Sequence, residues 1–234
     1  TTWSNPPGTL RAYDPASSAW TDLVSDVDIG LLRQFVVEVS GGTVFNKSEK
    51  LWFTDGTAAG TKEIYTATLE PRLGVAFNGG CLFFAEEKNK FSSLNKGTEP
   101  WFTDGTTGGT FMLKDIRVGR GSGCRGEPND ITTKPIAVGG YAYFLADDGT
   151  TGMELWRTDG TAAGTVLVRD INPGIESSWI SGFHAHKGEL YFIATNGVSG
   201  VEIWKTDGTE QGTVFLDVVP GPAGSIPRDI VSFG

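Results

Sequence analysis

The chain has 234 residues, of which 38% are hydrophobic and 11% aromatic, and it carries a formal net charge of −9. This composition supports a hydrophobic core, and the acidic balance argues against nucleic-acid binding, which gains affinity from Lys and Arg. No apolar stretch approaches the roughly 20 residues of a membrane span, so membrane insertion is not expected.

A twelve-residue string recurs along the chain. After a worn copy, LRAYDPASSAW at Leu10–Trp20, the copies read KLWFTDGTAAGT at Lys50–Thr61, EPWFTDGTTGGT at Glu99–Thr110, ELWRTDGTAAGT at Glu154–Thr165 and EIWKTDGTEQGT at Glu202–Thr213. Their aspartates lie roughly 40 to 55 residues apart, the length of a four-stranded propeller blade. We therefore predict an all-β fold, a five-bladed β-propeller of four-stranded antiparallel blades, with residues 1–234 as a single domain.

The most regular repeat unit predicts its four strands by alternating apolar and polar residues. These strands are Ile180–Lys187, Glu189–Ala194, Val201–Thr206 and Thr213–Val218. The second strand recurs at Cys81–Glu86 and Tyr141–Ala146, and its aromatic residues are expected to pack between blades.

The DGT segment is expected to form the turn between the third and fourth strands. An aspartate there accepts hydrogen bonds from backbone amides about two residues on, and the following glycine tolerates a positive φ. A turn is needed once in every blade, whereas catalysis needs an asymmetric site, so we predict a structural role. The five turn aspartates are Asp14, Asp55, Asp104, Asp159 and Asp207.

These strings resemble the ELWxxDGT repeat of bacterial and other secreted multi-repeat proteins, and the resemblance covers essentially the whole chain. It implies a propeller-like repeat fold and a location that is extracellular or at the cell surface, with no common reaction. Two copies depart from the pattern. Lys50 replaces the motif glutamate, and Leu10–Trp20 lacks the Gly that should follow Asp14.

The chain ends suggest how the ring closes. Ile226–Phe233 matches a first strand, and Thr1–Ser4 falls where a second strand belongs, so one blade would be stitched from the N- and C-terminal strands and hide two sheet edges. Alternatively, the terminal strands complete a neighbour's blade, and the chain self-assembles head to tail.

Varied loops on the face opposite the uniform turns are the expected ligand-binding region. The two largest loops, Glu86–Gly97 and Asp115–Asp130, hold a basic cluster that suits a carboxylate, sulfate or acidic glycan, although a solvated loop explains it too. The candidate ligand-binding residues are Lys88, Lys90, Lys96, Arg117, Arg120, Arg125 and Trp179.

No cofactor is expected apart from a possible calcium ion. Asp148 and Glu154 supply the oxygen ligands that Ca²⁺ prefers, but turn capping explains their spacing as well. His184 and His186 share one strand face and could start a metal site, yet no third ligand is suggested. No nucleophile triad, nucleotide-binding loop or marked carboxylate pair is found, so we predict no catalytic residues and no enzyme activity.

The two cysteines are expected at opposite faces of the propeller. Cys81 begins a second strand at the uniform-turn face, and Cys124 lies in a long loop at the other face, so no intrachain disulfide is expected. Asn46 lies in a glycosylation sequon that matters only in a eukaryotic secretory setting.

The resulting hypothesis is a non-catalytic extracellular recognition module that binds a glycan or a protein through its variable loop face. The alternative is a structural subunit of an extracellular filament or surface layer. A glycan-cleaving enzyme is the third reading, since some five-bladed enzymes use paired carboxylates for that reaction.

Overall fold

The computed structural model describes residues 8–14, 18–27, 35–88, 96–124, 134–217, 219–227 and 230–231. In these parts of the chain every regular element is a β-strand, and the strands form five antiparallel sheets. None of the described residues belongs to a helix that could cross a membrane. The predicted all-β class is therefore confirmed.

One sheet is a two-stranded hairpin of β1 (Gly8–Asp14) and β2 (Ala19–Val27). The other four sheets have four strands each, and we call them blades 2 to 5. Blade 2 consists of β3 (Val36–Val39), β4 (Gly42–Lys47), β5 (Lys50–Thr54) and β6 (Lys62–Tyr65). Blade 3 consists of β7 (Thr68–Phe77), β8 (Gly80–Lys88), β9 (Thr98–Thr103) and β10 (Phe111–Met112). Blade 4 consists of β11 (Ile136–Val138), β12 (Tyr141–Asp147), β13 (Met153–Thr158) and β14 (Val166–Arg169), and blade 5 of β15 (Ser181–His186), β16 (Glu189–Thr195), β17 (Val201–Thr206) and β18 (Val214–Leu216).

Within each blade, consecutive strands pair in order as an antiparallel meander. The four strands predicted for the most regular unit coincide with β15 to β18 to within two residues at every end. The worn motif copy forms the β1–β2 hairpin, with Asp14 as the last residue of β1. It thus occupies the place of a third and a fourth strand.

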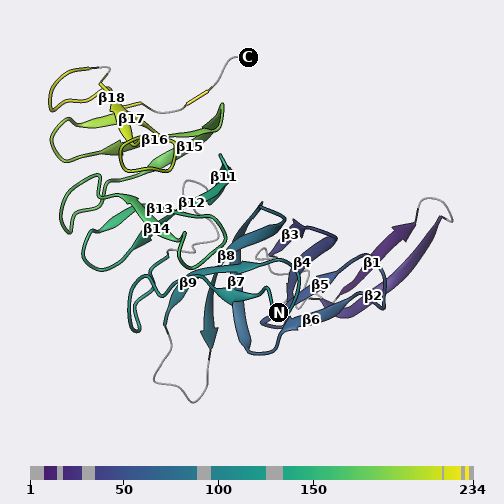
Figure 1. Cartoon of the computed structure of the whole chain (residues 1–234). Coiled ribbons are helices and arrows are strands. Elements are labelled where there is room, and N and C mark those ends of the chain that lie inside the picture. Colours follow the sequence, from purple (N-terminus) through teal and green to yellow (C-terminus); the bar gives the residue numbers. More distant parts are fainter. Residues whose placement is uncertain are drawn as a thin grey trace, which may run out of the picture.

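The blades follow one another along an arc, with the hairpin at one end and blade 5 at the other (Figure 1). The first strands of successive blades contact each other, β3 with β7, β7 with β11 and β11 with β15. Sheets that converge on their first strands in this way are arranged as neighbouring blades of a propeller.

Aromatic side chains fill the space between blades. Phe84 of blade 3 meets Phe144 of blade 4 with ring centroids 5.6 Å apart, and both are buried. Phe192 and Trp204 of blade 5 stack on each other and belong to the cluster that packs against Leu145 of blade 4. Burying such a side chain contributes about 2–3 kcal/mol, so these layers hold the arc together.

The motif turn has the same hydrogen bonds in all four blades. In blade 4, Asp159 Oδ1 accepts hydrogen bonds from the N–H of Thr161 at 2.9 Å and from its hydroxyl at 2.7 Å. Gly160 has a φ of 95°, which a residue with a side chain rarely adopts. Asp55, Asp104 and Asp207 make the same contacts with the threonine two residues on. The side chain of Asp14 lies outside the described part of the chain.

Asp159→Ala should lower the free energy of unfolding by about 1 kcal/mol, because the exposed turn loses two hydrogen bonds but buries no unpaired group. Urea unfolding followed by tryptophan fluorescence measures the difference. Asp159→Asn keeps an acceptor oxygen and is the control, with a smaller loss. Equal losses in the two variants would show that the turn does not depend on the acceptor.

The described residues give no pairing between the hairpin and blade 5. Of the predicted first strand Ile226–Phe233, the described residues Ile226, Pro227, Ile230 and Val231 are not in a strand. The N–H of Ile226 is instead bonded to Val201 O at 3.1 Å, and Pro227 has no N–H to give to a ladder. For these residues the strand prediction was wrong, and Thr1–Ser4 lies outside the described residues.

Candidate functional site: the pocket between blades 4 and 5

The loops opposite the motif turns pack against one another through glycines. In each of blades 3, 4 and 5, a glycine before the third strand touches the segment that leaves the fourth strand, which we call the crossover segment. A Cβ on Gly152 would lie 2.7 Å from Ile175 O, and one on Gly200 would lie 2.5 Å from Gly224 N. Both glycines also have a positive φ. These loops therefore form a continuous layer along the arc.

A buried glutamate fixes each crossover segment. Glu99 accepts the N–H of Ile116 at 2.9 Å and that of Gly123 at 2.8 Å, one on each carboxylate oxygen. Glu154 accepts the N–H of Ile171 at 3.2 Å and the hydroxyl of Ser178. Glu202 binds the N–H of Ser225 at 2.9 Å and its hydroxyl at 2.6 Å in the same way. We call these three residues the clamp glutamates.

The clamped segment also accepts a backbone hydrogen bond from the next blade. Asp147, the last residue of β12, donates its N–H to Gly123 O at 2.8 Å, and Thr195, the last residue of β16, donates to Ser178 O at 2.9 Å. The clamps of Glu99 and Glu154 thus join the third strand of one blade to the second strand of the following blade. The crossover segments on this face are therefore fixed by hydrogen bonds to two neighbouring blades.

Burial raises the pKa of two clamp glutamates to about 7, from a usual value of about 4.5. Removal from water is the main cause for both Glu99 and Glu154, and the hydrogen bonds from the crossover segment oppose it in part. Nearby aspartates, Asp115 and Asp170, raise these values a little further.

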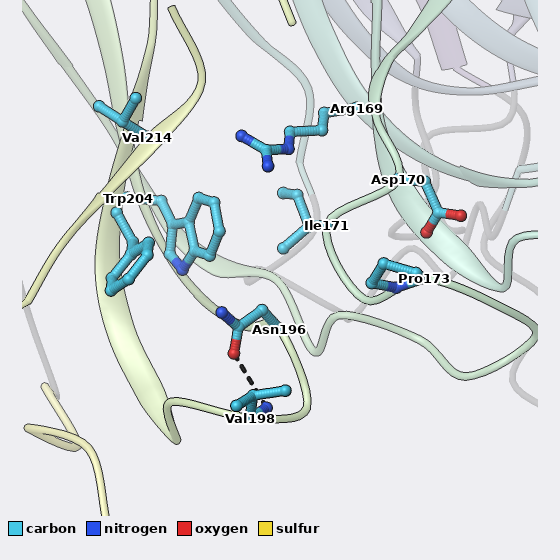
Figure 2. A pocket seen from close by; sticks show the side chains of 9 residues that line it. Arg169, Asp170, Ile171, Pro173, Asn196, Val198, Trp204 and Val214 are labelled. Carbon is cyan, nitrogen blue, oxygen red and sulfur yellow. Dashed lines mark hydrogen bonds between the residues drawn. The ribbon is translucent and has the colours of Figure 1, made fainter. Parts of the chain in front are cut away.

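A pocket of about 390 Å³ opens in this layer between blades 4 and 5 (Figure 2). Such a volume is that of a small-ligand site. Blade 4 and its crossover segment contribute one wall, and the loop after β16 and the strands β17 and β18 contribute the other. The residues used below are Arg169, Ile171, Pro173, Asn196, Val198 and Trp204.

Two hydrogen-bond donors converge on this mostly apolar hollow. The guanidinium of Arg169 extends across it and gives one hydrogen bond, from Nη1 to Thr213 O at 2.8 Å. The amide of Asn196 lies opposite, below Trp204 (Figure 2). Its Oδ1 accepts the N–H of Val198 at 3.0 Å, which leaves Nδ2 with a 3.4 Å contact to Ser199 Oγ.

The predicted basic cluster is largely paired with acids where the structure describes it. Lys88 is bonded to Glu70, Lys96 lies 3.5 Å from Asp115 Oδ2, and Arg117 lies 2.6 Å from Asp147 Oδ2. Arg120 is exposed, and Lys90 and Arg125 lie outside the described residues. An anion bound by these pairs would have to displace a carboxylate.

Trp179, the aromatic ligand-binding candidate, is 76% exposed and has a φ of 54°, which is unusual for a bulky residue. It lies in the crossover segment of blade 4, directly after the clamped Ser178. Large apolar side chains are exposed in the same layer, which also holds Val118, Ile175, Val198, Val219 and Ile226.

The calcium candidates are already engaged as hydrogen-bond acceptors. Asp148 Oδ1 accepts the N–H groups of Thr150 and Thr151, and Glu154 is a clamp glutamate. Within the described ranges no three His, Cys, Asp or Glu residues lie together as a metal site. His184 has a buried Nε2 without a partner, and His186 packs against Tyr191. Calcium binding stays a prediction.

Both cysteine thiols are free and buried. Cys81 belongs to the hydrophobic cluster between blades 2 and 3, and Cys124 belongs to the cluster between blades 3 and 4. The backbone of Cys124 forms an isolated antiparallel β-bridge with Ala146. Burial raises the pKa of both thiols well above the usual value, so neither is suited to nucleophilic chemistry.

The clamp was missed in the sequence, although its signal is present. The motif glutamate and its partner on the crossover segment are separated by 24, 24 and 23 residues in blades 3, 4 and 5. A second string, DIRVG at Asp115, DINPG at Asp170 and DVVPG at Asp217, also recurs with the repeat and opens each crossover segment.

No protein-family model matches the chain, and no curated protein matches it. Among solved structures, puromycin hydrolase is 14% identical over 88% of this chain and 32% of that chain, with a TM-score of 0.44. TolB from Acinetobacter baumannii is 13% identical over 91% of this chain and 49% of that chain, with a TM-score of 0.40. Exo-β-1,3-galactanase from Phanerochaete chrysosporium is 11% identical over 92% of this chain and 54% of that chain, with a TM-score of 0.32. This chain spans about a third to a half of these proteins, and we draw no functional conclusion from likenesses at this level.

Proposed function

We propose that the chain is a non-catalytic recognition module, extracellular or at the cell surface, which binds a glycan or a protein through the loop layer opposite the motif turns. The observation that carries the proposal is the pocket between blades 4 and 5. It lies in loops that buried glutamates and interblade hydrogen bonds hold in place. A site on a rigid scaffold loses little conformational entropy when it binds.

The chemistry of the layer favours binding over catalysis. Its buried carboxylates, Glu99 and Glu154, are bonded to the protein's own N–H and O–H groups. Exposed apolar side chains such as Trp179 and Val198 instead suit contact with a ligand. The rival reading as a filament or surface-layer subunit has no comparable observation behind it.

We also propose that the arc is part of a five-bladed ring of the ELWxxDGT repeat type. The hairpin β1–β2 stands where the third and fourth strands of a further blade belong, and the repeated strings support this reading. The closing pairing between N- and C-terminal strands is part of this proposal.

Trp179→Ala is expected to weaken binding at least about tenfold on a glycan array or in protein capture, because removing an exposed aromatic anchor costs more than about 1.4 kcal/mol at a binding hot spot. Trp20→Ala is the matched control. Trp20 is 63% exposed in β2, beside the turn of the hairpin and away from the loop layer. Equal binding by both variants, or no bound glycan or protein for the parent chain, would contradict the proposal.

A further inference from the structure

The pocket between blades 4 and 5 has a matched counterpart one repeat earlier, between blades 3 and 4. Lys114 stands where Arg169 stands, since Lys114 Nζ donates to Thr165 O at 3.0 Å and Arg169 Nη1 donates to Thr213 O at 2.8 Å. Arg169 ends a fourth strand and Lys114 lies two residues after one, and each reaches the residue that precedes the next blade's fourth strand. The two boundaries can therefore be compared position by position.

The two boundaries differ in the charge of the loop beside these cations: the earlier one holds an ion pair, and both of its positions are neutral at the later one, where Asn172 stands in place of Arg117. Asp147 pairs with Arg117 at 2.6 Å, and the next residue, Asp148, is a second carboxylate. At the later boundary the two acid positions hold Thr195 and Asn196. The register is secure, because Asp147 and Thr195 each end a second strand and donate to the clamped segment.

The exchange of Asp148 for Asn196 keeps the backbone and removes the charge. Asp148 Oδ1 accepts the N–H of Thr150 at 2.7 Å, and Asn196 Oδ1 accepts the N–H of Val198 at 3.0 Å. The same turn is thus built without a carboxylate, and the amide presents Nδ2 to the pocket in its place (Figure 2).

Arg169 has no acidic partner among the described residues, none of which forms an ion pair with it. Its neighbour Asp170 also lines the pocket, but its carboxylate points away from the Arg169 guanidinium in Figure 2, and Asp170 Oδ2 accepts the N–H of Gly174 at 3.4 Å. A guanidinium has five N–H donors in a planar fork, and Arg169 donates one of them to Thr213 O.

From these observations we infer that the pocket binds a carboxylate, which Arg169 and the Asn196 amide receive while Ile171, Pro173 and Val198 enclose the body that carries it. Planar oxyanions match the guanidinium fork, and apolar walls strengthen the pairing by excluding water. The inference rests on the proposed function and gives it a ligand class. The carboxylate could belong to a uronic acid of a glycan or to the end of a peptide.

The test is calorimetric titration of the full chain with two matched pairs of probes. Methyl β-glucuronide is compared with methyl β-glucoside, and N-acetylleucine with N-acetylleucinamide. We expect one acid or both to bind, with the neutral partner of each acid at least about tenfold weaker, because a charge-assisted hydrogen bond is lost. The acid that binds identifies the source of the carboxylate. If neither acid binds, the inference is overturned.

Three variants locate the binding. Arg169→Gln should weaken the acid about tenfold or more, whereas Lys114→Gln removes the equivalent interblade bond of the earlier boundary and should leave binding unchanged. Asn196→Asp restores the acid that the earlier boundary carries and should also weaken binding about tenfold, with the turn intact. Undiminished binding by Arg169→Gln or Asn196→Asp would overturn the inference. The proposed function fails separately, if the parent chain binds no glycan or protein or if Trp179→Ala binds as well as Trp20→Ala.

Discussion

Replacing Glu99 with alanine is expected to lower the free energy of unfolding at pH 7 by about 3 kcal/mol, because two buried N–H groups, of Ile116 and Gly123, lose their acceptor. An unsatisfied buried donor costs about 1–3 kcal/mol, which is more than a surface ion pair contributes. The crossover segment of blade 3 should also loosen, since Gly123 O receives the N–H of Asp147 from blade 4. Urea unfolding measures the first effect, and amide exchange at Asp147 measures the second.

The chain offers its own control for this prediction. Lys50 occupies the motif position of Glu99 in blade 2, where it donates to Glu63 Oε1 at 2.8 Å and to Thr66 O at 2.9 Å. It is partly exposed, so Lys50→Ala should cost less than about 1 kcal/mol. If the two alanine variants lose the same stability, the clamp is no stronger than a surface contact, and the prediction fails.

Much of the fold was predictable because the same strand pattern and turn motif occur several times along the chain. Strand ends in blade 5, the motif turn and the aromatic second strands all follow from local periodicity and turn chemistry. The departure at Ile226 arises from a non-local contact. Its N–H is bonded to Val201 O across the blade, and a pattern of alternating residues carries no information about that partner.

The candidate site was predictable only in outline. The variable loop face was expected, but the charge cluster was read from composition, which cannot show that Lys88 is bonded to Glu70 and Arg117 to Asp147. Arg169 escaped notice because it ends a strand and its neighbours in sequence are ordinary. Its distinction lies in the pocket that it lines together with Asn196, a neutral residue where the preceding blade has Asp148.

The free energy of unfolding is expected to fall as the pH rises from about 4.5 to about 7. Burial raises the pKa of Glu99 and Glu154 to about 7 in the folded chain, so in this window the folded state holds protons that the unfolded state has released. The contribution is complete below the unfolded value and lost as the pH passes through the folded one. It amounts to about 3 kcal/mol for each carboxyl group.

Urea unfolding from pH 4.5 to pH 8 measures this slope. Glu154→Gln removes one titrating group and should reduce the slope by about half, and adding Glu99→Gln should remove most of the remainder. These variants lower stability overall, so the slope and not the absolute value is the readout. A parent chain whose stability is constant or rises over this range would refute the prediction.

The motif turns impose the opposite trend at lower pH. Hydrogen bonds from Thr161 and Thr209 hold the pKa of Asp159 and Asp207 below the usual value of 3.8, so the stability that these carboxylates add is present above that value and lost as the pH falls through the folded pKa. The two groups of carboxylates therefore stabilise the fold together only over a narrow range of pH. Maximum stability should fall between about pH 4 and pH 5, below the neutral range, because the clamps favour the protonated form while the turns still require the ionised one.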